Sequence, residues 1–223
     1  VSNSAENVNL TYKKGPLLPI VINPPPGGCP GNLVTFTVAT DPNSAQYRWT
    51  WPWGTQVTTN PTITINIPLS AAAGTFNMDV NGINADCGNG PALSIPFTVY
   101  AIPTVTVTGD NMVCQNEVLL YTTQSGMMNY NWSVSGGTLV SASGSVATVS
   151  WPNTGSHSVT VNYMNLSGCT PASPTVFPVT VNAPPVPAIG GNSSVCEGTT
   201  GVVYSTAAGN LNYSWSISAG GTI

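Results

Sequence analysis

Short alternations of apolar and polar residues run along the whole chain. Residues 34–38 read Val-Thr-Phe-Thr-Val, which places Val34, Phe36 and Val38 on one face of an extended strand. The same alternation predicts further strands over residues 62–67, 76–80, 97–100, 118–121, 130–134, 147–151, 157–161 and 176–181. Gly, Pro and Asn separate these segments about every 8–12 residues, which is typical of an all-β sandwich. No segment carries apolar residues at the helical period, so we predict almost no helix.

A Tyr-x-Trp triplet recurs at constant spacing. Its tryptophans are Trp49, Trp132 and Trp215, and both steps are 83 residues (132 − 49 and 215 − 132). Self-similarity at a fixed period indicates tandem copies of one structural unit. We therefore predict an array of immunoglobulin-like β-sandwich domains, each about 83 residues long.

Proline-rich joints divide the chain. Residues 1–15 are expected to form a tail or the end of a preceding repeat. Repeat 1 covers residues 16–101, repeat 2 covers 102–183, and an incomplete repeat 3 covers 184–223. Because the joints are short and rich in proline, we expect stiff coupling between neighbouring domains and an extended rod.

The aligned tryptophans are the predicted core anchors. Trp49, Trp132 and Trp215 occupy the strand that immunoglobulin-like sandwiches call C, where a large aromatic side chain packs between the two sheets. Truncating such a residue in a core costs about 3–5 kcal/mol. We therefore expect these three side chains to organise the core of their repeats.

The chain is nearly free of charge. Charged residues make up 4% of the sequence, against about 25% in an average soluble protein, and the formal net charge is −4. The basic residues are Lys13, Lys14 and Arg48. Binding to nucleic acid or to anionic lipid needs several clustered cations, so we expect neither partner. No apolar run reaches the ~18 residues that span a bilayer, and we expect no membrane contact by this region.

Cysteines also recur with the repeat. Cys29, Cys114 and Cys196 precede the tryptophan of their repeat by 20, 18 and 19 residues (49 − 29, 132 − 114 and 215 − 196). A second cysteine follows in repeats 1 and 2, at Cys87 and Cys169. No Cys-x-x-Cys pair occurs, and a single histidine argues against a zinc site. Disulfides are the better interpretation, and they predict an extracellular location at a cell surface.

Two pairing schemes are open. Pairing within a repeat joins Cys29 to Cys87 and Cys114 to Cys169, and leaves Cys196 alone. In an immunoglobulin-like strand order, however, the first cysteine lies between strands A and B and the second lies in the F–G turn. These ends are ~17–20 Å apart, whereas a disulfide allows ~7 Å between Cα atoms. In an end-to-end array the two ends of successive repeats meet. That scheme, which we favour, joins Cys29 to Cys169, pairs Cys114 and Cys196 with later repeats, and pairs Cys87 with an earlier one.

Four short strings carry a family resemblance. Residues 113–116 (Val-Cys-Gln-Asn), 195–198 (Val-Cys-Glu-Gly), 130–138 (Tyr-Asn-Trp-Ser-Val-Ser-Gly-Gly-Thr) and 168–170 (Gly-Cys-Thr) resemble PKD-like, immunoglobulin-like repeats. Such repeats occur in very large surface proteins of Bacteroidetes-type bacteria, including gliding-motility adhesins and other cargo of the type IX secretion system. The resemblance covers residues 16–223. It implies a stalk, a spacer or a binding tip.

No residues are arranged for catalysis. The seven Asp and Glu residues are scattered, so neither a glycosidase pair nor a clustered calcium site is apparent. His157 aligns with Phe76 of repeat 1, and no Ser or Asp is placed to form a triad with it. We therefore predict no catalytic, cofactor-binding or metal-binding residue, and a chain that is not an enzyme.

Trp53 is the candidate binding residue. The string Trp51-Pro52-Trp53 stands where repeat 2 has Val134-Ser135-Gly136, so repeat 1 departs from the family pattern there. An exposed tryptophan in a loop can stack on a sugar ring, which would make Trp53 a glycan contact. The alternative is a structural role, in which the ring covers Pro52 or the neighbouring domain joint.

These observations favour a structural and adhesive region of a large secreted cell-surface protein. The repeats would form a filament or stalk that presents adhesion sites, and the family resemblance extends this expectation to gliding motility. The expected partners are neighbouring repeats of the same chain, surface polysaccharide and other surface proteins. The alternative is a carbohydrate-binding accessory region of a larger secreted enzyme.

Overall fold

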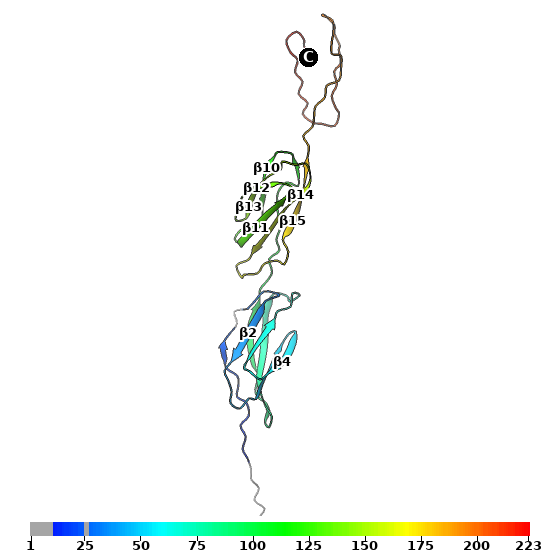
Figure 1. Ribbon diagram of the computed structural model, residues 1–223. Coiled ribbons are helices and arrows are strands. Elements are labelled where there is room, and N and C mark those ends of the chain that lie inside the picture. The colour runs from blue at the N-terminus through cyan, green and yellow to red at the C-terminus, as the bar shows by residue number, and fades with distance from the viewer. Residues whose placement is uncertain (1–10, 25–26) are drawn as a thin grey trace, which may run out of the picture. The chain divides into compact units, whose positions relative to one another are not determined.

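The computed structural model describes residues 11–24 and 27–223 (Figure 1). This part of the chain contains strands and turns and no helix, which confirms the prediction of an all-β tandem sandwich fold. Of the predicted tail, residues 1–10 lie outside the described residues. The chain forms two compact units. The first contains the chain up to Thr106 with Thr123–Asn131 and Val161–Thr175, and the second contains Val107–Thr122, Trp132–Thr160 and Val176–Ile223.

Repeat 1 is a sandwich of two antiparallel sheets. One sheet has the order β1-β2-β5, formed by Val21–Asn23, Leu33–Val38 and Thr62–Asn66. The other has the order β4-β3-β6-β7, with β8 beside β6, formed by Gly54–Thr58, Gln46–Trp51, Gly74–Asn84, Gly88–Asn89 and Leu93–Val99. A parallel bridge between Gly28 and Val99 brings the segment before β2 to the second sheet.

The core of repeat 1 follows from alternation along these strands. Burial in β2 reads exposed-buried-exposed-buried, with Phe36 and Val38 fully buried. Trp49 in β3 is fully buried between the sheets, as the repeat alignment predicts. Its indole Nε1 donates a hydrogen bond to Thr58 Oγ1 at 2.9 Å, so the ring is buried without an unpaired donor.

Repeat 2 is a second sandwich. One sheet has the order β10-β13-β12, formed by Val118–Thr122, Val146–Ser150 and Thr138–Ser143. The other has the order β11-β14-β15-β9, formed by Met128–Ser135, Gly155–Met164, Thr175–Asn182 and Met112–Cys114. Strand β9 runs parallel to β15 and pairs Cys114 with Asn182.

The two repeats differ in one strand. In repeat 1, β4 pairs with β3, whereas in repeat 2 the equivalent β12 pairs with β13 of the opposite sheet. Trp132 is 7% exposed and is a core residue as predicted, but Trp151 after β13 is fully buried. Trp151 Nε1 donates to Tyr121 Oη at 3.2 Å. Repeat 2 thus has a second aromatic anchor that the alignment of tryptophans does not reveal.

Residues 184–223 form no strand. Their β-type backbone pairing consists of an isolated bridge between Gly190 and Ser205. The prediction that Trp215 is a core anchor is wrong for this structure, because Trp215 is 43% exposed. Trp49 and Trp132 are covered by a second sheet, whereas no sheet formed by the described residues covers Trp215. Other apolar side chains of this segment are exposed for the same reason: Val186, Ile189, Val203, Leu211 and Ile217.

Candidate functional site

A disulfide joins repeat 1 to repeat 2. The Sγ atoms of Cys29 and Cys169 are 2.00 Å apart and their Cα atoms are 5.6 Å apart, across a sequence separation of 140. Cys29 is 8% exposed and Cys169 is 1% exposed, so the bond is shielded from solvent. This is the pairing of the between-repeat scheme. The within-repeat bond from Cys29 to Cys87 does not form.

A tight turn presents Cys29. The backbone N–H of Asn32 donates to Cys29 O at 2.9 Å, and Asn32 Oδ1 accepts from Cys29 N at 2.8 Å. Pro30 and Gly31 occupy the centre of the turn, and Gly31 has φ of 88°. Proline followed by a residue with positive φ is the pattern of a type II turn. Two further backbone hydrogen bonds, Gly31 N to Ile67 O and Ile67 N to Asn32 O, fix the turn to the end of β5.

A single asparagine organises the loop of Cys169. Asn165 Oδ1 accepts hydrogen bonds from Ser167 N at 3.0 Å and from Cys169 N at 2.9 Å. The amide Nδ2 of the same side chain donates to Ala101 O at 2.8 Å. Asn165 therefore connects the cysteine loop to the segment that joins repeats 1 and 2.

Side chains of repeat 2 bind the rest of that joining segment. Thr104 O accepts from Tyr163 Oη at 3.3 Å, and Val105 O accepts from Thr175 Oγ1 at 3.0 Å. Burial raises the pKa of Tyr163, although a hydrogen bond to Thr123 works in the opposite direction. The phenol therefore stays protonated and able to donate. The linker is hydrogen bonded rather than free.

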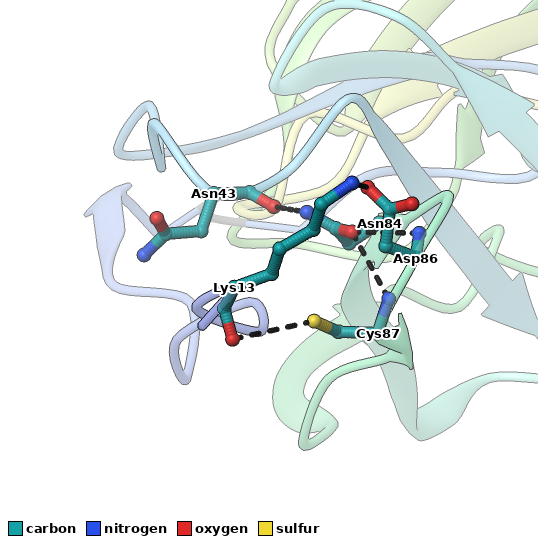
Figure 2. A network of polar contacts seen from close by, with 5 residues as sticks. All are labelled: Lys13, Asn43, Asn84, Asp86 and Cys87. Atoms are coloured by element: carbon teal, nitrogen blue, oxygen red, sulfur yellow. Dashed lines mark hydrogen bonds and ion pairs between the residues drawn. The ribbon is translucent and has the colours of Figure 1, made fainter. Parts of the chain in front are cut away.

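The loop of Cys87 has the same organisation in repeat 1 (Figure 2). Asn84 Oδ1 accepts from Asp86 N at 2.9 Å and from Cys87 N at 3.1 Å, while its Nδ2 donates to Asn43 O at 2.7 Å. Lys13 Nζ lies 2.6 Å from Asp86 Oδ2, and Cys87 Sγ lies 3.6 Å from Lys13 O. The segment before repeat 1 thus passes beside Cys87, as the linker at Ala101 passes beside the Cys169 loop.

Asp41 fixes that N-terminal segment. Its carboxylate accepts from Leu17 N at 2.9 Å, Asn43 N at 3.0 Å and Ser44 Oγ at 2.7 Å. Burial raises the pKa of Asp41, but the hydrogen bonds from Ser44, Asn43 and Leu17 outweigh burial and lower it below its usual value. The buried Pro16 packs so closely on Gly82 that a side chain at Gly82 would collide with it.

The other three cysteines that we expect to form disulfides are unbonded. Within the described residues, Cys87, Cys114 and Cys196 are exposed free thiols. The asparagines that hold the two loops, Asn84 and Asn165, are absent from the sequence-based predictions. Aligning the repeats on their second cysteine, instead of on the tryptophan, would have revealed an asparagine three or four residues before it.

Trp53 has a structural role. Its ring is partly buried and meets Phe76 edge-on at a centroid distance of 5.4 Å and Phe97 at 6.1 Å. Its Nε1 lies 3.3 Å from Asn66 O. The ring is more exposed than those of Trp49 and Trp132, as expected, but it covers the aromatic edge of the core. A glycan contact by Trp53 stays a prediction.

His157 also packs as a structural ring. It stacks on Trp151 with an interplanar angle of 11° and a centroid distance of 5.9 Å, and its Nε2 lies 2.9 Å from Asn153 O.

Across the described residues, no group of three or more His, Cys, Asp or Glu side chains is placed to hold a metal ion. A helix long and apolar enough to cross a membrane is likewise not found in the described part of the chain.

Comparison with known proteins identifies the domains. The family described as PKD-like domain matches residues 16–97, 100–179 and 182–223. No curated protein sequence matches the chain.

Solved structures that resemble this chain include three multidomain proteins. The three N-terminal domains of the bacteriophage RB49 outer capsid protein Hoc are 16% identical, with 85% of this chain and 69% of that chain covered and a TM-score of 0.42. The C-terminal 282-residue fragment of intimin, solved with the translocated intimin receptor, is 14% identical, with coverage of 81% and 68% and a TM-score of 0.38. The fibronectin(III)-like modules of Clostridium thermocellum CbhA are 15% identical, with coverage of 74% and 94% and a TM-score of 0.32.

Proposed function

Because this chain belongs to the PKD-like domain family, we propose that it is a structural and adhesive repeat region of a large secreted cell-surface protein. Its repeats form a stalk or filament that presents adhesion sites to surface polysaccharide or other surface proteins. The finer proposal, based on the resemblance of the repeat motifs, is a gliding-motility adhesin exported by the type IX secretion system.

The observation that supports this proposal is the covalent link between repeats. Because Cys29 is bonded to Cys169, tension applied at the two ends of the chain passes through the disulfide. Almost all strands of both complete repeats lie in the 140-residue stretch between these cysteines and are outside the path of the force. A stalk benefits from this arrangement because its domains stay folded under tension. A disulfide also persists only in an oxidising compartment, which supports an extracellular location.

Stretching single molecules of the full chain tests the mechanical role. Reduction exposes the 140-residue stretch to force, and at ~3.4 Å per extended residue we expect roughly 480 Å of additional extension. The oxidised chain should unfold without this length. The double variant C29S/C169S should behave like the reduced chain under all conditions. Equal extension of oxidised and reduced wild-type protein would contradict a mechanical link.

A carbohydrate-binding accessory region is the competing function. The packing of Trp53 on Phe76 and Phe97 gives this alternative less support, because the ring already serves the core. A glycan array probed with the full chain and with W53F separates the two functions. Wild-type binding to one polysaccharide class that W53F loses would favour the accessory region. Loss of surface spreading in the source bacterium after deletion of this region would support the gliding adhesin.

A further inference from the structure

Three cysteines are presented by one type of turn. In Cys29–Asn32, Cys114–Glu117 and Cys196–Thr199, the carbonyl of the cysteine accepts from the backbone N–H three residues later, at 2.9, 3.2 and 3.1 Å. The third residue of each turn has positive φ: 88° at Gly31, 69° at Asn116 and 80° at Gly198. Cys29 is bonded, and the other two are exposed thiols. We call these three residues the turn cysteines.

The sandwiches hold the turns of Cys29 and Cys114 in the same way. Gly31 N donates to Ile67 O at 2.7 Å, and in repeat 2 Asn116 N donates to Trp151 O at 2.8 Å. The return hydrogen bonds, Ile67 N to Asn32 O and Trp151 N to Glu117 O, are 2.9 and 3.0 Å long. Cys114 therefore occupies in repeat 2 the position that Cys29 occupies in repeat 1.

The other two cysteines, Cys87 and Cys169, are the loop cysteines. An asparagine side chain, Asn84 or Asn165, accepts from the backbone N–H of each of them. Cys169 is bonded to a turn cysteine, whereas Cys87 is exposed and free. The described residues thus contain one turn cysteine bonded to a loop cysteine, two free turn cysteines (Cys114 and Cys196) and one free loop cysteine (Cys87).

Bonding within repeat 2 is excluded by the sheet. Cys114 pairs with Asn182 at the end of β15, while Cys169 precedes Thr175, where β15 begins. Seven steps of ~3.3 Å place the two ends of this strand about 23 Å apart. A disulfide allows ~7 Å between Cα atoms, and Cys169 is already bonded to Cys29, so Cys114 has no free partner in its own repeat.

The bond between Cys29 and Cys169 shows which partner each free cysteine takes, because Cys114 and Cys196 lie in the same kind of turn as Cys29 and Cys87 lies in the same kind of loop as Cys169. We infer that Cys114 and Cys196 each form a disulfide with the loop cysteine of another PKD-like repeat, and that Cys87 does so with a turn cysteine. The inference rests on the proposed function in that it requires an oxidising, extracellular setting.

The chemistry is a thiol–disulfide exchange with a small-molecule disulfide, such as oxidised glutathione, as the oxidant. The thiolate of the turn cysteine attacks one sulfur of the oxidant, which forms a mixed disulfide and releases one glutathione thiolate. The thiolate of the loop cysteine then attacks the mixed disulfide and releases the second. The two protons and two electrons lost by the protein thiols are carried by two molecules of reduced glutathione.

An inserted repeat tests the inference. A second copy of residues 102–183 is placed between Ala183 and Pro184 of the full chain, so that Cys114 precedes a complete neighbouring repeat. In this copy, the exposed Leu166 and Val118 are changed (L166M, V118I) so that its peptides have distinct masses. The protein is refolded with a glutathione redox buffer and digested with pepsin without reduction.

We expect peptides that join Cys29 to Cys169, and Cys114 to the loop cysteine of the inserted copy. The count of free thiols in denaturant should then be three, as in the wild-type chain, whose free cysteines are Cys87, Cys114 and Cys196. The matched variant C114S should expose the loop cysteine of the copy and raise the count to four. A count of five, or a bond between the two cysteines inside the inserted copy, would overturn the inference. The stretching experiment depends on Cys29 and Cys169 alone, so its result is independent of this one.

Discussion

Asn84 and Asn165 hold the cysteine loops of successive repeats with the same two hydrogen bonds. Each side-chain carbonyl accepts from the backbone N–H of the cysteine and from a second N–H one or two residues earlier. Each amide also donates to a backbone carbonyl, to Asn43 O or to Ala101 O. The loop cysteine is therefore positioned before any bond forms, which reduces the ordering required when it meets its partner.

Replacing Asn165 by alanine should destabilise repeat 2. N165A removes the acceptor for Ser167 N and Cys169 N and the donor to Ala101 O, and hydrogen bonds of this kind contribute about 0.5–1.5 kcal/mol each. For the three bonds together we expect a loss of about 1.5–4.5 kcal/mol in urea unfolding of the oxidised chain. N165D is the matched control, since it keeps the acceptor and loses the donor, and should retain part of the stability. If N165A and N165D lose the same free energy of unfolding, the effect comes from the hydrogen bond to Ala101 O alone.

Removing the inter-repeat disulfide should lower stability by about 2–5 kcal/mol, because the bond closes a long loop in the unfolded chain. The double variant C29S/C169S tests this in guanidinium unfolding. The control is C87S, which changes a free thiol and should leave the midpoint unchanged. A reductant should shift the wild-type midpoint to that of the double variant and should not affect the double variant itself. A midpoint insensitive to reduction would count against the bond.

Alternation and repeat spacing are sufficient to predict the fold. They predict β2, β10 and β14 within a few residues of their observed bounds and identify Trp49 and Trp132 as core residues. They do not predict that β4 and β12 join different sheets, because a strand with few buried residues carries little information about its partner. In β12 all six residues are exposed. The choice depends on tertiary packing, in which Trp151 fills the core of repeat 2.

The cysteine pairing shows how far the sequence can lead. Cysteine spacing alone leaves two pairing schemes. Strand order favours pairing between repeats, because it places the two cysteines of one repeat at opposite ends of the sandwich, farther apart than a disulfide allows. The parallel pairing of β9 with β15 supplies the physical reason, since it carries Cys114 to the far end of the strand that follows Cys169.

Trp53 shows the opposite case. Its sequence context resembles an exposed loop, and contacts with Phe76 and Phe97 from distant strands decide its environment.

The tryptophans of the three repeats should differ in their contribution to stability. Trp49 is fully buried, Trp132 is 7% exposed and Trp215 is 43% exposed. We expect W49A and W132A to lose about 3–5 kcal/mol each in urea unfolding. W215A should lose less than about 0.5 kcal/mol, as for other surface substitutions. A large loss for W215A would show that residues 184–223 are packed in solution.

Stability should depend on Asp41 at acid pH. The pKa of Asp41 is lowered in the folded protein, since its hydrogen bonds outweigh burial. Its contribution is therefore complete above the unfolded value of ~3.9 and is lost as the pH falls through the folded pKa. At pH 7, D41N should cost about 1 kcal/mol, and the variant and the wild type should converge once the pH falls below the lowered folded pKa of Asp41. D79N, which changes an exposed carboxylate in β6, is the control. A difference that stays constant from pH 7 to pH 2 would contradict the assignment.

Supplying the strands that follow should bury Trp215. A sandwich needs two facing sheets, and residues 184–223 contribute neither in this structure. Ile223 aligns with Leu139 of repeat 2, because Gly221-Thr222 matches Gly137-Thr138. Appending a copy of residues 140–182 after Ile223 therefore completes the repeat.

In this chimera we expect Trp215 emission to shift to shorter wavelength and a further cooperative unfolding transition to appear. The matched control carries V161D in the appended copy. It places a carboxylate where the structure has a fully buried valine, and it should keep Trp215 exposed. If the emission of Trp215 is the same in the chimera, the control and the original chain, the equivalence of Trp215 with Trp49 and Trp132 does not hold. If it shifts in the chimera alone, burial of this tryptophan depends on the opposing sheet, as it does in the two complete repeats.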